Sequence, residues 1–262
     1  MAISYNTGSV AHLTASTSSS TTTVPAGVLS GDAVFVLVWG FTTASGTLTP
    51  TLSSTKTAPS LVGTKQNSTG GGIQTSAGVF LINAGSSDAG ATLTYGLSGG
   101  SGGSYWFNVG IVSYTGANAT PVDVNAGTEF FSASSAGTTV TPSATTVAAG
   151  DWQIQFIGCG PPSGANFTVP GGITQREAIT SGTNAGLLLQ IGDSNGSVGG
   201  AGTSIGNTTW TCSGEGASNT WSNSFTVGLQ PPSAAAPAAF VPQQPPVVAV
   251  INPGWRNAAH SR

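Results

Sequence analysis

The segment Trp152-Gln153-Ile154-Gln155-Phe156 alternates large apolar and polar side chains with a period of two residues. Successive side chains of a β-strand point to opposite faces of its sheet, whereas a helix repeats its apolar positions every three or four residues. The segment is therefore predicted to be a strand. Its Trp, Ile and Phe side chains should face the core, and its two glutamines should face water.

Three more runs extend this reading. Phe107–Ile111 and Phe225–Leu229 also alternate, which predicts further half-buried antiparallel strands with one wet face. Ala33–Trp39 (AVFVLVW) is apolar throughout, which predicts a central strand covered on both faces. Gly, Ser and Asn clusters separate the runs, and no useful length of helical periodicity occurs. The expected fold class is all-β, an antiparallel β-sandwich of jelly-roll-like type.

The two halves of the chain echo each other. Val24–Gly40 (VPAGVLSGDAVFVLVWG) resembles Thr146–Gly160 (TVAAGDWQIQFIGCG), because each places Gly-Asp before an apolar run. Further on, Gly78–Ser87 matches Gly186–Asn195. We therefore expect an internally duplicated sandwich, residues 1–230, with pseudo-repeats at about 24–116 and 146–230. Two copies are too few for a solenoid.

After Leu229 the composition changes to PPSAAAPAAFVPQQPPVVAVINPGWRNAAHSR. Proline favours extended polyproline geometry and does not continue a sheet interior, so residues 231–262 are predicted to be an extended Pro/Ala-rich arm. Such termini are usually passive tails. This one carries more apolar anchor material than a solvating tail needs, and we favour docking on a partner. The predicted contact residues are Phe240, Val247, Val248, Val250, Ile251 and Trp255.

Charge excludes several partners. Only 5% of residues are charged, and the five Lys and Arg are scattered, so no basic stripe exists for nucleic acid. The longest apolar run, Ala33–Trp39, is far shorter than the roughly 20 residues that span a bilayer. The opening residues MAISYNTGSVAHL lack both parts of a secretory signal. We expect a soluble chain made in the cytoplasm, with no membrane partner.

Catalytic constellations are not evident. The two histidines, His12 and His260, lie near opposite ends, so neither a His-rich metal site nor imidazole catalysis is expected. Gly99-x-Ser101-x-Gly103 and Gly192-x-Ser194-x-Gly196 fit a nucleophile-elbow pattern, but no helix is predicted after either. We therefore expect no enzyme, no cofactor and no metal.

Carboxylates offer one remaining route to catalysis. Asp123 with Glu129, or Asp193 with Glu215, would suit a glycosidase if either pair met in a cleft. Asp32 and Asp151 are better explained as turn residues that precede strands.

Cysteine and tryptophan leave two questions open. Cys159 and Cys212 are able to pair, but two free buried thiols are favoured, because a sandwich of this size needs no crosslink. Tryptophans that flank loops, Trp106, Trp210 and Trp221, are candidates to face a glycan, since aromatic faces stack on sugars. Core packing is the commoner fate of such residues. Trp106 and Trp221 are the glycan-facing candidates we retain.

At Ile111–Gly127 (IVSYTGANATPVDVNAG) a strand ends in Tyr-x-Gly, and a loop reading x-x-Pro-hydrophobic-Asp follows. This motif resembles β-sandwich domains that are common in tail and virion-surface proteins of phages infecting actinobacteria. Similar domains occur in bacterial surface proteins. The resemblance covers about Val24–Pro232. Its other elements are the two Gly-Asp turns and Ile173-x-x-Arg176.

The resemblance implies a structural component of a bacteriophage virion, either a capsid decoration protein or a minor tail protein. It implies no catalytic residues. Its partners would be other virion proteins, major capsid or tail subunits, and phage release by lysis would need no export signal. Homo-oligomers are the default for such assemblies, and a trimer would fit shell positions. The alternative is a glycan-binding adhesin module on the virion or the cell surface.

Overall fold

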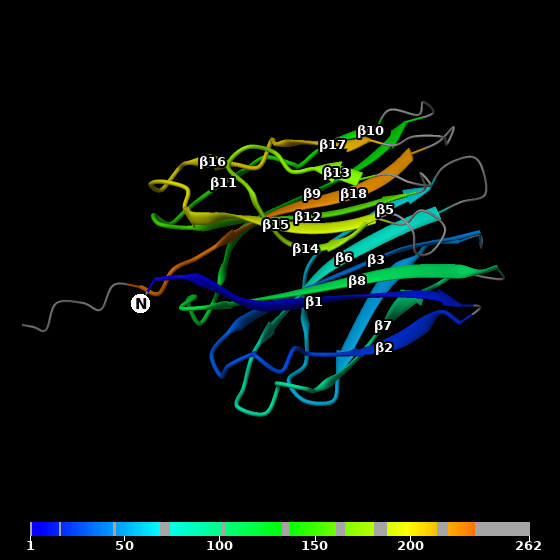
Figure 1. Ribbon diagram of the computed structural model, residues 1–262, viewed down its shortest axis with the longest axis horizontal. Coiled ribbons are helices and arrows are strands. Elements are labelled where there is room, and N and C mark those ends of the chain that lie inside the picture. Colours follow the sequence, from blue (N-terminus) through cyan, green and yellow to red (C-terminus); the bar gives the residue numbers. More distant parts are fainter. Residues whose placement is uncertain are drawn as a thin grey trace, which may run out of the picture. The chain divides into compact units, whose positions relative to one another are not determined.

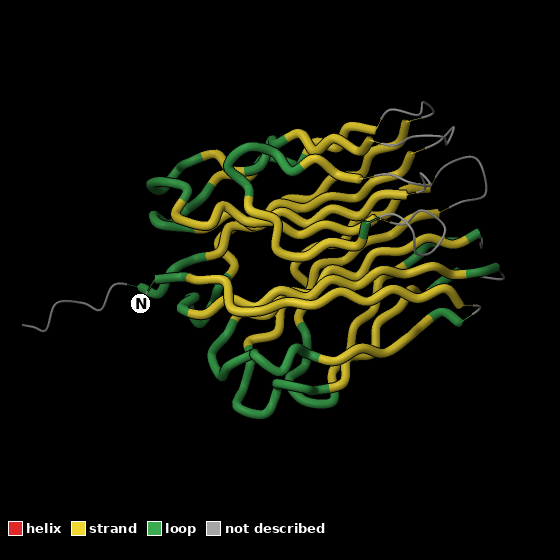
Figure 2. Tube along the Cα trace, in the orientation of Figure 1, coloured by secondary structure: helices red, strands yellow, loops and turns green. Residues whose placement is uncertain are grey.

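The computed structural model describes most of the chain as antiparallel strands joined by turns (Figures 1 and 2). One compact unit runs from Met1 to Pro232, and Ser233–Arg262 form a second. The all-β antiparallel class predicted from the sequence is confirmed for the described part, which contains no helix. The described residues are 2–15, 17–43, 46–68, 74–100, 103–132, 137–160, 166–180, 188–213 and 220–233.

The first half of the chain forms two sheets. The larger has the order β1-β8-β3-β6-β5 and the smaller β2-β7-β4. The strands of the larger sheet are β1 (Ser4–Ala15), β8 (Tyr105–Thr115), β3 (Ala33–Thr42), β6 (Gln74–Asn83) and β5 (Ser60–Ser68). Those of the smaller sheet are β2 (Ser19–Thr23), β7 (Thr92–Ser98) and β4 (Thr49–Ser54).

The second half forms one large sheet, β14-β15-β12-β18-β9, and two small ones, β10-β17-β13 and β11-β16. The large sheet consists of β14 (Thr174–Ile179), β15 (Leu188–Ser197), β12 (Trp152–Gly160), β18 (Thr220–Leu229) and β9 (Val122–Ser132). The small sheets contain β10 (Gly137–Val140), β17 (Thr209–Ser213), β13 (Asn166–Thr168), β11 (Ala144–Thr145) and β16 (Ser204–Ile205).

The strand order of the two halves corresponds. Replacing β1, β8, β3, β6 and β5 by β9, β18, β12, β15 and β14 converts the first large sheet into the second. Likewise, replacing β2, β7 and β4 by β10, β17 and β13 converts the small sheet of the first half into the three-stranded small sheet of the second. The segments that echo each other in the sequence therefore lie at the same places in the two orders.

The two large sheets pack face to face, and the small sheets cover their outer faces, which gives four layers (Figure 1). In the central core, Phe35 and Leu37 of β3 meet Phe156 of β12 and Phe225 of β18. β1 lies against β14, β5 against β9, and β3 against β12. Exchanging the halves converts the β1–β14 contact into the β5–β9 contact and leaves the β3–β12 contact unchanged, which is the pattern of an approximate two-fold.

Each large sheet also has an outer core. Val34, Val36 and Val38, on the outer face of β3, pack with Leu93 and Tyr95 of β7. The second outer core contains Ile157, Cys159, Phe167, Leu188 and Trp210. The prediction that Ala33–Trp39 is covered on both faces is confirmed, because residues 34–39 are 0% exposed.

The prediction of a wet face on the neighbouring strands is wrong. Gln153 is 7% and Gln155 0% exposed, because the small sheets of the second half cover them. Gln155 Oε1 accepts 2.7 Å from Trp210 Nε1, and Gln153 Oε1 accepts 3.0 Å from Gly206 N. Buried polar side chains must be hydrogen-bonded, and here a polar strand face is satisfied by a second layer instead of by water.

The other two alternating strands depart from prediction for the same reason. Asn108 of β8 faces the central core and is 0% exposed, while Ser224 and Thr226 of β18 lie under the outer layer, also at 0%. The two-residue periodicity of these strands was predicted correctly. What it does not reveal is that both faces of each large sheet are covered.

Candidate functional site

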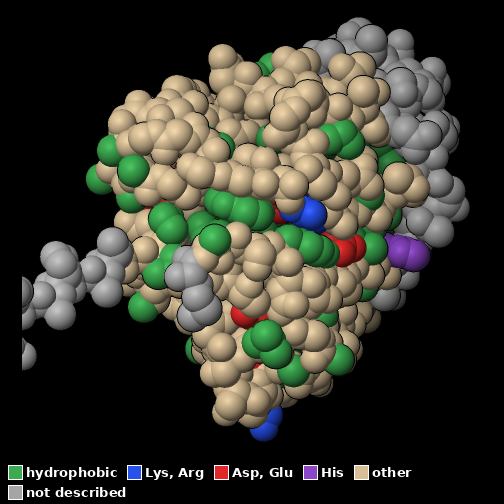
Figure 3. Space-filling view, turned by 60° about the vertical axis from the view of Figure 1, so that its left-hand side comes forward, with side chains coloured by type: hydrophobic (Ala, Val, Ile, Leu, Met, Phe, Trp, Pro, Cys, Tyr) green, Lys and Arg blue, Asp and Glu red, His purple; other side chains and the backbone are tan. Residues whose placement is uncertain are grey.

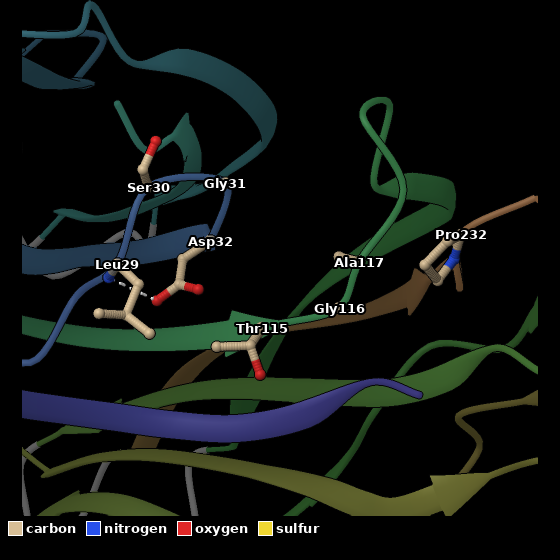
Figure 4. Close-up of a pocket in the computed structure, with 8 residues that line it drawn as sticks. All are labelled: Leu29, Ser30, Gly31, Asp32, Thr115, Gly116, Ala117 and Pro232. Atoms are coloured by element: carbon tan, nitrogen blue, oxygen red, sulfur yellow. Dashed lines mark hydrogen bonds between the residues drawn. The ribbon is translucent and has the colours of Figure 1, made fainter. Parts of the chain in front are cut away.

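The described body has a hollow of about 400 Å³ where β3 begins and β8 ends (Figure 4). The loop Leu29–Asp32 forms one wall, and Thr115–Ala117 with Pro232 form the other. Gly31 and Gly116 have φ of 90° and 70°, which glycine adopts without strain, so both loops turn sharply into the hollow. Leu29 is 57% exposed, which makes the rim apolar.

Asp32 lies at the base of the hollow and holds its wall together. Its Oδ2 accepts hydrogen bonds from Leu29 N at 2.9 Å, Asn6 Nδ2 at 2.8 Å and Ser113 Oγ at 2.7 Å. The side chain is only 2% exposed, and three donors satisfy its charge. This is the turn-residue role predicted for Asp32.

The chemistry of the hollow favours contact over catalysis. Asp32 is the one titratable side chain among its lining residues, and the hydroxyls of Ser30 and Thr115 have no base beside them in the lining. A nucleophile with a partnered base, or two carboxylates, would be needed for hydrolysis. The hollow instead offers an apolar rim over a rigid polar base.

A charged cluster joins β1 and β8 of the first half to β14 and β15 of the second. Arg176 Nε and Nη2 donate to the two carboxylate oxygens of Asp193 at 2.7 Å and 2.9 Å. Tyr114 Oη donates 2.9 Å to Asp193, Tyr5 Oη donates 3.0 Å to Glu177, and the Arg176 guanidinium lies 4.6 Å from the Tyr5 ring centre. Asp193 is 0% exposed, so a bidentate partner is what makes its charge tolerable.

Titration in this cluster follows from burial and the nearby carboxylates. Burial, the charge of Asp193 and the hydrogen bond to it raise the pKa of Tyr114 well above its ordinary value. Burial and Glu177 raise the pKa of Tyr5 to about 12. Both phenols therefore stay protonated at neutral pH, and the cluster acts as a fixed tie between sheets.

The described members of the two carboxylate pairs considered from the sequence each have other partners. Glu129 lies on the surface, with Oε2 3.8 Å from Lys65 Nζ, and Asp193 pairs with Arg176. Glu215 lies outside the described residues. The neighbour that the sequence reading missed for Asp123 is Asp151, and the two carboxyls shift each other's pKa, that of Asp123 downward and that of Asp151 upward. Both residues belong to motifs already singled out, the Pro-hydrophobic-Asp loop and the second Gly-Asp turn.

The other catalytic candidates are structural where the structure describes them. Ser194 Oγ donates 2.6 Å to Gly196 O and accepts from Gln153 N at 3.1 Å, inside strand β15. His12 is exposed on β1. Among the described residues no group of three or more His, Cys, Asp or Glu side chains is arranged to hold a metal ion.

The three tryptophan candidates differ in how far their rings are exposed. Trp106 is partly buried against the central core, with its ring stacked on Phe41 at 4.4 Å and 13°. Trp210 is 0% and Trp221 5% exposed. The expectation of an exposed ring is therefore wrong for Trp210 and Trp221. Trp210 points from the outer sheet into the outer core, and Trp221 lies on β18 of the covered large sheet.

Several predicted residues fall outside the described part. The arm residues Phe240, Val247, Val248, Val250, Ile251 and Trp255 all do. Cys159 is buried in the outer core of the second half, and the side chain of Cys212 is not described.

No protein-family model, curated protein or solved structure matches this chain. No helix in the described ranges has the length and hydropathy needed to cross a membrane.

Proposed function

We propose that the chain is a structural component of a bacteriophage virion, either a capsid decoration protein or a minor tail protein. The observation that carries the proposal is the strand order. The order β1-β8-β3-β6 beside β2-β7-β4 in the first half, and β9-β18-β12-β15 beside β10-β17-β13 in the second, supports a jelly roll in each half. Jelly rolls build viral capsid and lectin domains.

We propose further that the chain is a duplicated jelly roll. The corresponding orders, the echoing segments and the approximate two-fold packing all support a repeat of one unit. Each roll departs from an ideal jelly roll in one strand. β5 and β14 extend the edges of the large sheets instead of completing the small ones. The core between the large sheets joins the two rolls into one compact unit.

The surface suits a coat component. The protein has 13 charged residues of 262, five basic and eight acidic, and two ion pairs of the described residues join four of them. The face in Figure 3 carries few charged side chains on a largely uncharged background. A neutral, rigid surface packs against neighbours with little charge to desolvate.

Assembly is proposed to use two elements, the hollow at Leu29 and the apolar residues of the C-terminal arm. An exposed leucine at the rim of an apolar hollow is typical of a protein contact. The proposed partners are major capsid or tail subunits and further copies of the chain, in a symmetric oligomer such as a trimer. The proposed location is the virion, after synthesis in the host cytoplasm and release by lysis.

Reconstitution tests this assignment. Particles made without the chain are incubated with the purified protein and sedimented, and the bound fraction is measured. Saturable binding at a fixed number of sites is expected. Failure to bind at micromolar concentration, with a folded protein and intact particles, would contradict the proposal.

Glycan binding is the second candidate, supported by the partly exposed ring of Trp106. Its ring is only partly buried, and aromatic rings bind sugars by stacking. A glycan array should then give binders that Trp106→Ala abolishes. An array without binders removes this candidate.

A further inference from the structure

Asp151 is a buried carboxyl without a donor. It precedes β12 and is 0% exposed, and no hydrogen-bond donor of the described residues reaches either of its oxygens. Its surroundings from the neighbouring strands are uncharged. A Cβ built on Gly228 of β18 would lie 3.3 Å from Asp151 Oδ2, 2.9 Å from Val124 Cγ2 and 3.5 Å from Ile205 Cδ1.

Among the described residues, the charged group that acts on Asp151 is Asp123 of β9. β9 pairs Val124 with Gly228 but Val122 with Leu229, so Asp123 is the extra residue of a β-bulge. Bulges re-aim a side chain, and this one directs Asp123 toward the start of β12. Asp123 Oδ2 also accepts from Val147 N at 2.5 Å and from Ala148 N at 3.0 Å.

These contacts divide the roles of the two carboxyls. Two backbone N–H groups stabilise negative charge on Asp123, while nothing but a proton lets Asp151 hydrogen-bond to it. The corresponding residue of the first half, Asp32, needs no such proton, because three donors satisfy it. The same turn position thus holds a carboxyl with three hydrogen-bond donors in one half and a carboxyl without a donor in the other.

We propose that Asp123 and Asp151 share one proton and form a pH-sensitive latch that ties β9 to the turn Val147–Ala148 and the start of β12. The latch is closed while Asp151 is protonated. Loss of that proton places two carboxylates in hydrogen-bonding contact at a buried site, and their repulsion loosens this end of the second large sheet.

The pH range follows from the titration of the pair. Burial, then the hydrogen bond to Asp123 and its charge, raise the pKa of Asp151 to about 7. Burial alone would raise the pKa of Asp123 too, but hydrogen bonds from Asp151, Ala148 N and Val147 N lower it. An acid with a raised pKa stabilises the fold fully below its unfolded pKa, about 4, and this stabilisation is lost as the pH rises to about 7.

The test compares the unfolding equilibria of the full chain and of Asp151→Asn between about pH 4 and 8. The amide keeps the shape and donates to Asp123 without a titrating proton. The ratio of the variant's folding constant to that of the wild type should rise up to tenfold per pH unit and level off near pH 7. The variant should be the less stable protein at the acid end of the range and the more stable one at the alkaline end. A ratio that does not change with pH would overturn the proposal.

Asp32→Asn is the matched control. It removes a carboxyl that three donors already satisfy at the equivalent turn, and its stability ratio to wild type should not reproduce the rise expected for Asp151→Asn. If Asp151→Asn does not fold, infrared spectroscopy of the carboxyl groups serves instead. It is measured on Glu177→Gln, because Glu177 also has a raised pKa and its protonated-carboxyl band would overlap that of Asp151. A protonated-carboxyl band that disappears near pH 7 is expected. Complete ionisation of all carboxyls by about pH 5 would refute the shared proton.

Discussion

The indole of Trp39 lies against the backbone of Gly158, so that a Cβ on this glycine would come within 2.2 Å of Trp39 Cγ. The two residues occupy corresponding places. Trp39 pairs with Asn108 across β3 and β8, and Gly158 pairs with Asn223 across β12 and β18. Trp39 Nε1 crosses the central core and donates 3.0 Å to Asn223 Oδ1. One half supplies the largest side chain at this position, and the other supplies the space for it.

Replacing Gly158 by alanine should destabilise the protein by about 3 kcal/mol, because neither the fully buried indole nor the strand has room to move. Chemical denaturation measures the loss. Gly171→Ala is the matched control, since a Cβ there meets nothing within 4 Å, and it should stay within about 0.5 kcal/mol of wild type. Equal effects at both sites would show that the sheets do not meet at Trp39.

Trp39→Phe should cost about 2–3 kcal/mol, since it leaves a void and removes the donor to Asn223. Asn223 Nδ2 has no described partner, so the change would leave its amide without any. A double-mutant cycle with Asn223→Leu isolates the hydrogen bond. A coupling energy near zero would mean that the bond contributes nothing to the inter-sheet contact.

Two ion pairs with different burial should respond differently. Arg176→Met leaves the charge of Asp193 buried without its bidentate partner and should cost about 3–5 kcal/mol. Lys65→Met breaks a pair whose side chains are 37% and 46% exposed and should cost less than about 1 kcal/mol. Comparable losses in thermal or urea unfolding would argue against the cluster as the tie between the halves.

Alkaline pH should open the same cluster. Because the pKa of Tyr114 is raised on folding, its stabilising contribution is complete below the unfolded pKa of about 10 and is lost as the pH rises beyond it. Tyr114→Phe should be less stable than wild type at neutral pH, but its stability should fall less steeply above about pH 10. Parallel pH profiles would contradict a buried phenol.

The assembly contacts are tested by Leu29→Asp and by Trp255→Ala. A carboxylate at the apolar rim would have to be desolvated on binding, so Leu29→Asp should lower occupancy on particles at least tenfold while leaving the melting temperature unchanged. Trp255→Ala should weaken binding through the arm. Leu61→Asp, at an equally exposed leucine away from the hollow, is the control and should bind normally.

The sequence predicted the strands well because periodicity reports local geometry. Ala33–Trp39 is a doubly covered strand as expected, and Gly31 and Gly150 turn the chain before β3 and β12 with φ of 90° and 87°. The prediction of exposed side chains failed at Gln153 and Gln155. The sequence pattern of a polar strand face is the same whether water or a second layer of protein hydrogen-bonds to it. The number of layers is a long-range property that no local period encodes.

The same limit applies to the paired acids. Asp123 and Asp151 lie in motifs that the sequence made visible, but their meeting depends on a β-bulge in β9 that no residue pattern announces. A different signal was available for the central core. Within residues 1–230, Trp-x-Asn occurs at Trp106-x-Asn108 and at Trp221-x-Asn223, and marks the corresponding strands β8 and β18.

The central claim is that this chain is built into a virus particle. Quantitative mass spectrometry of purified particles, with the major capsid protein as the internal standard, tests it most directly. The account predicts a fixed copy number, hundreds per particle for a decoration protein or a handful for a tail protein. Absence of the chain from particles that are otherwise complete would contradict it.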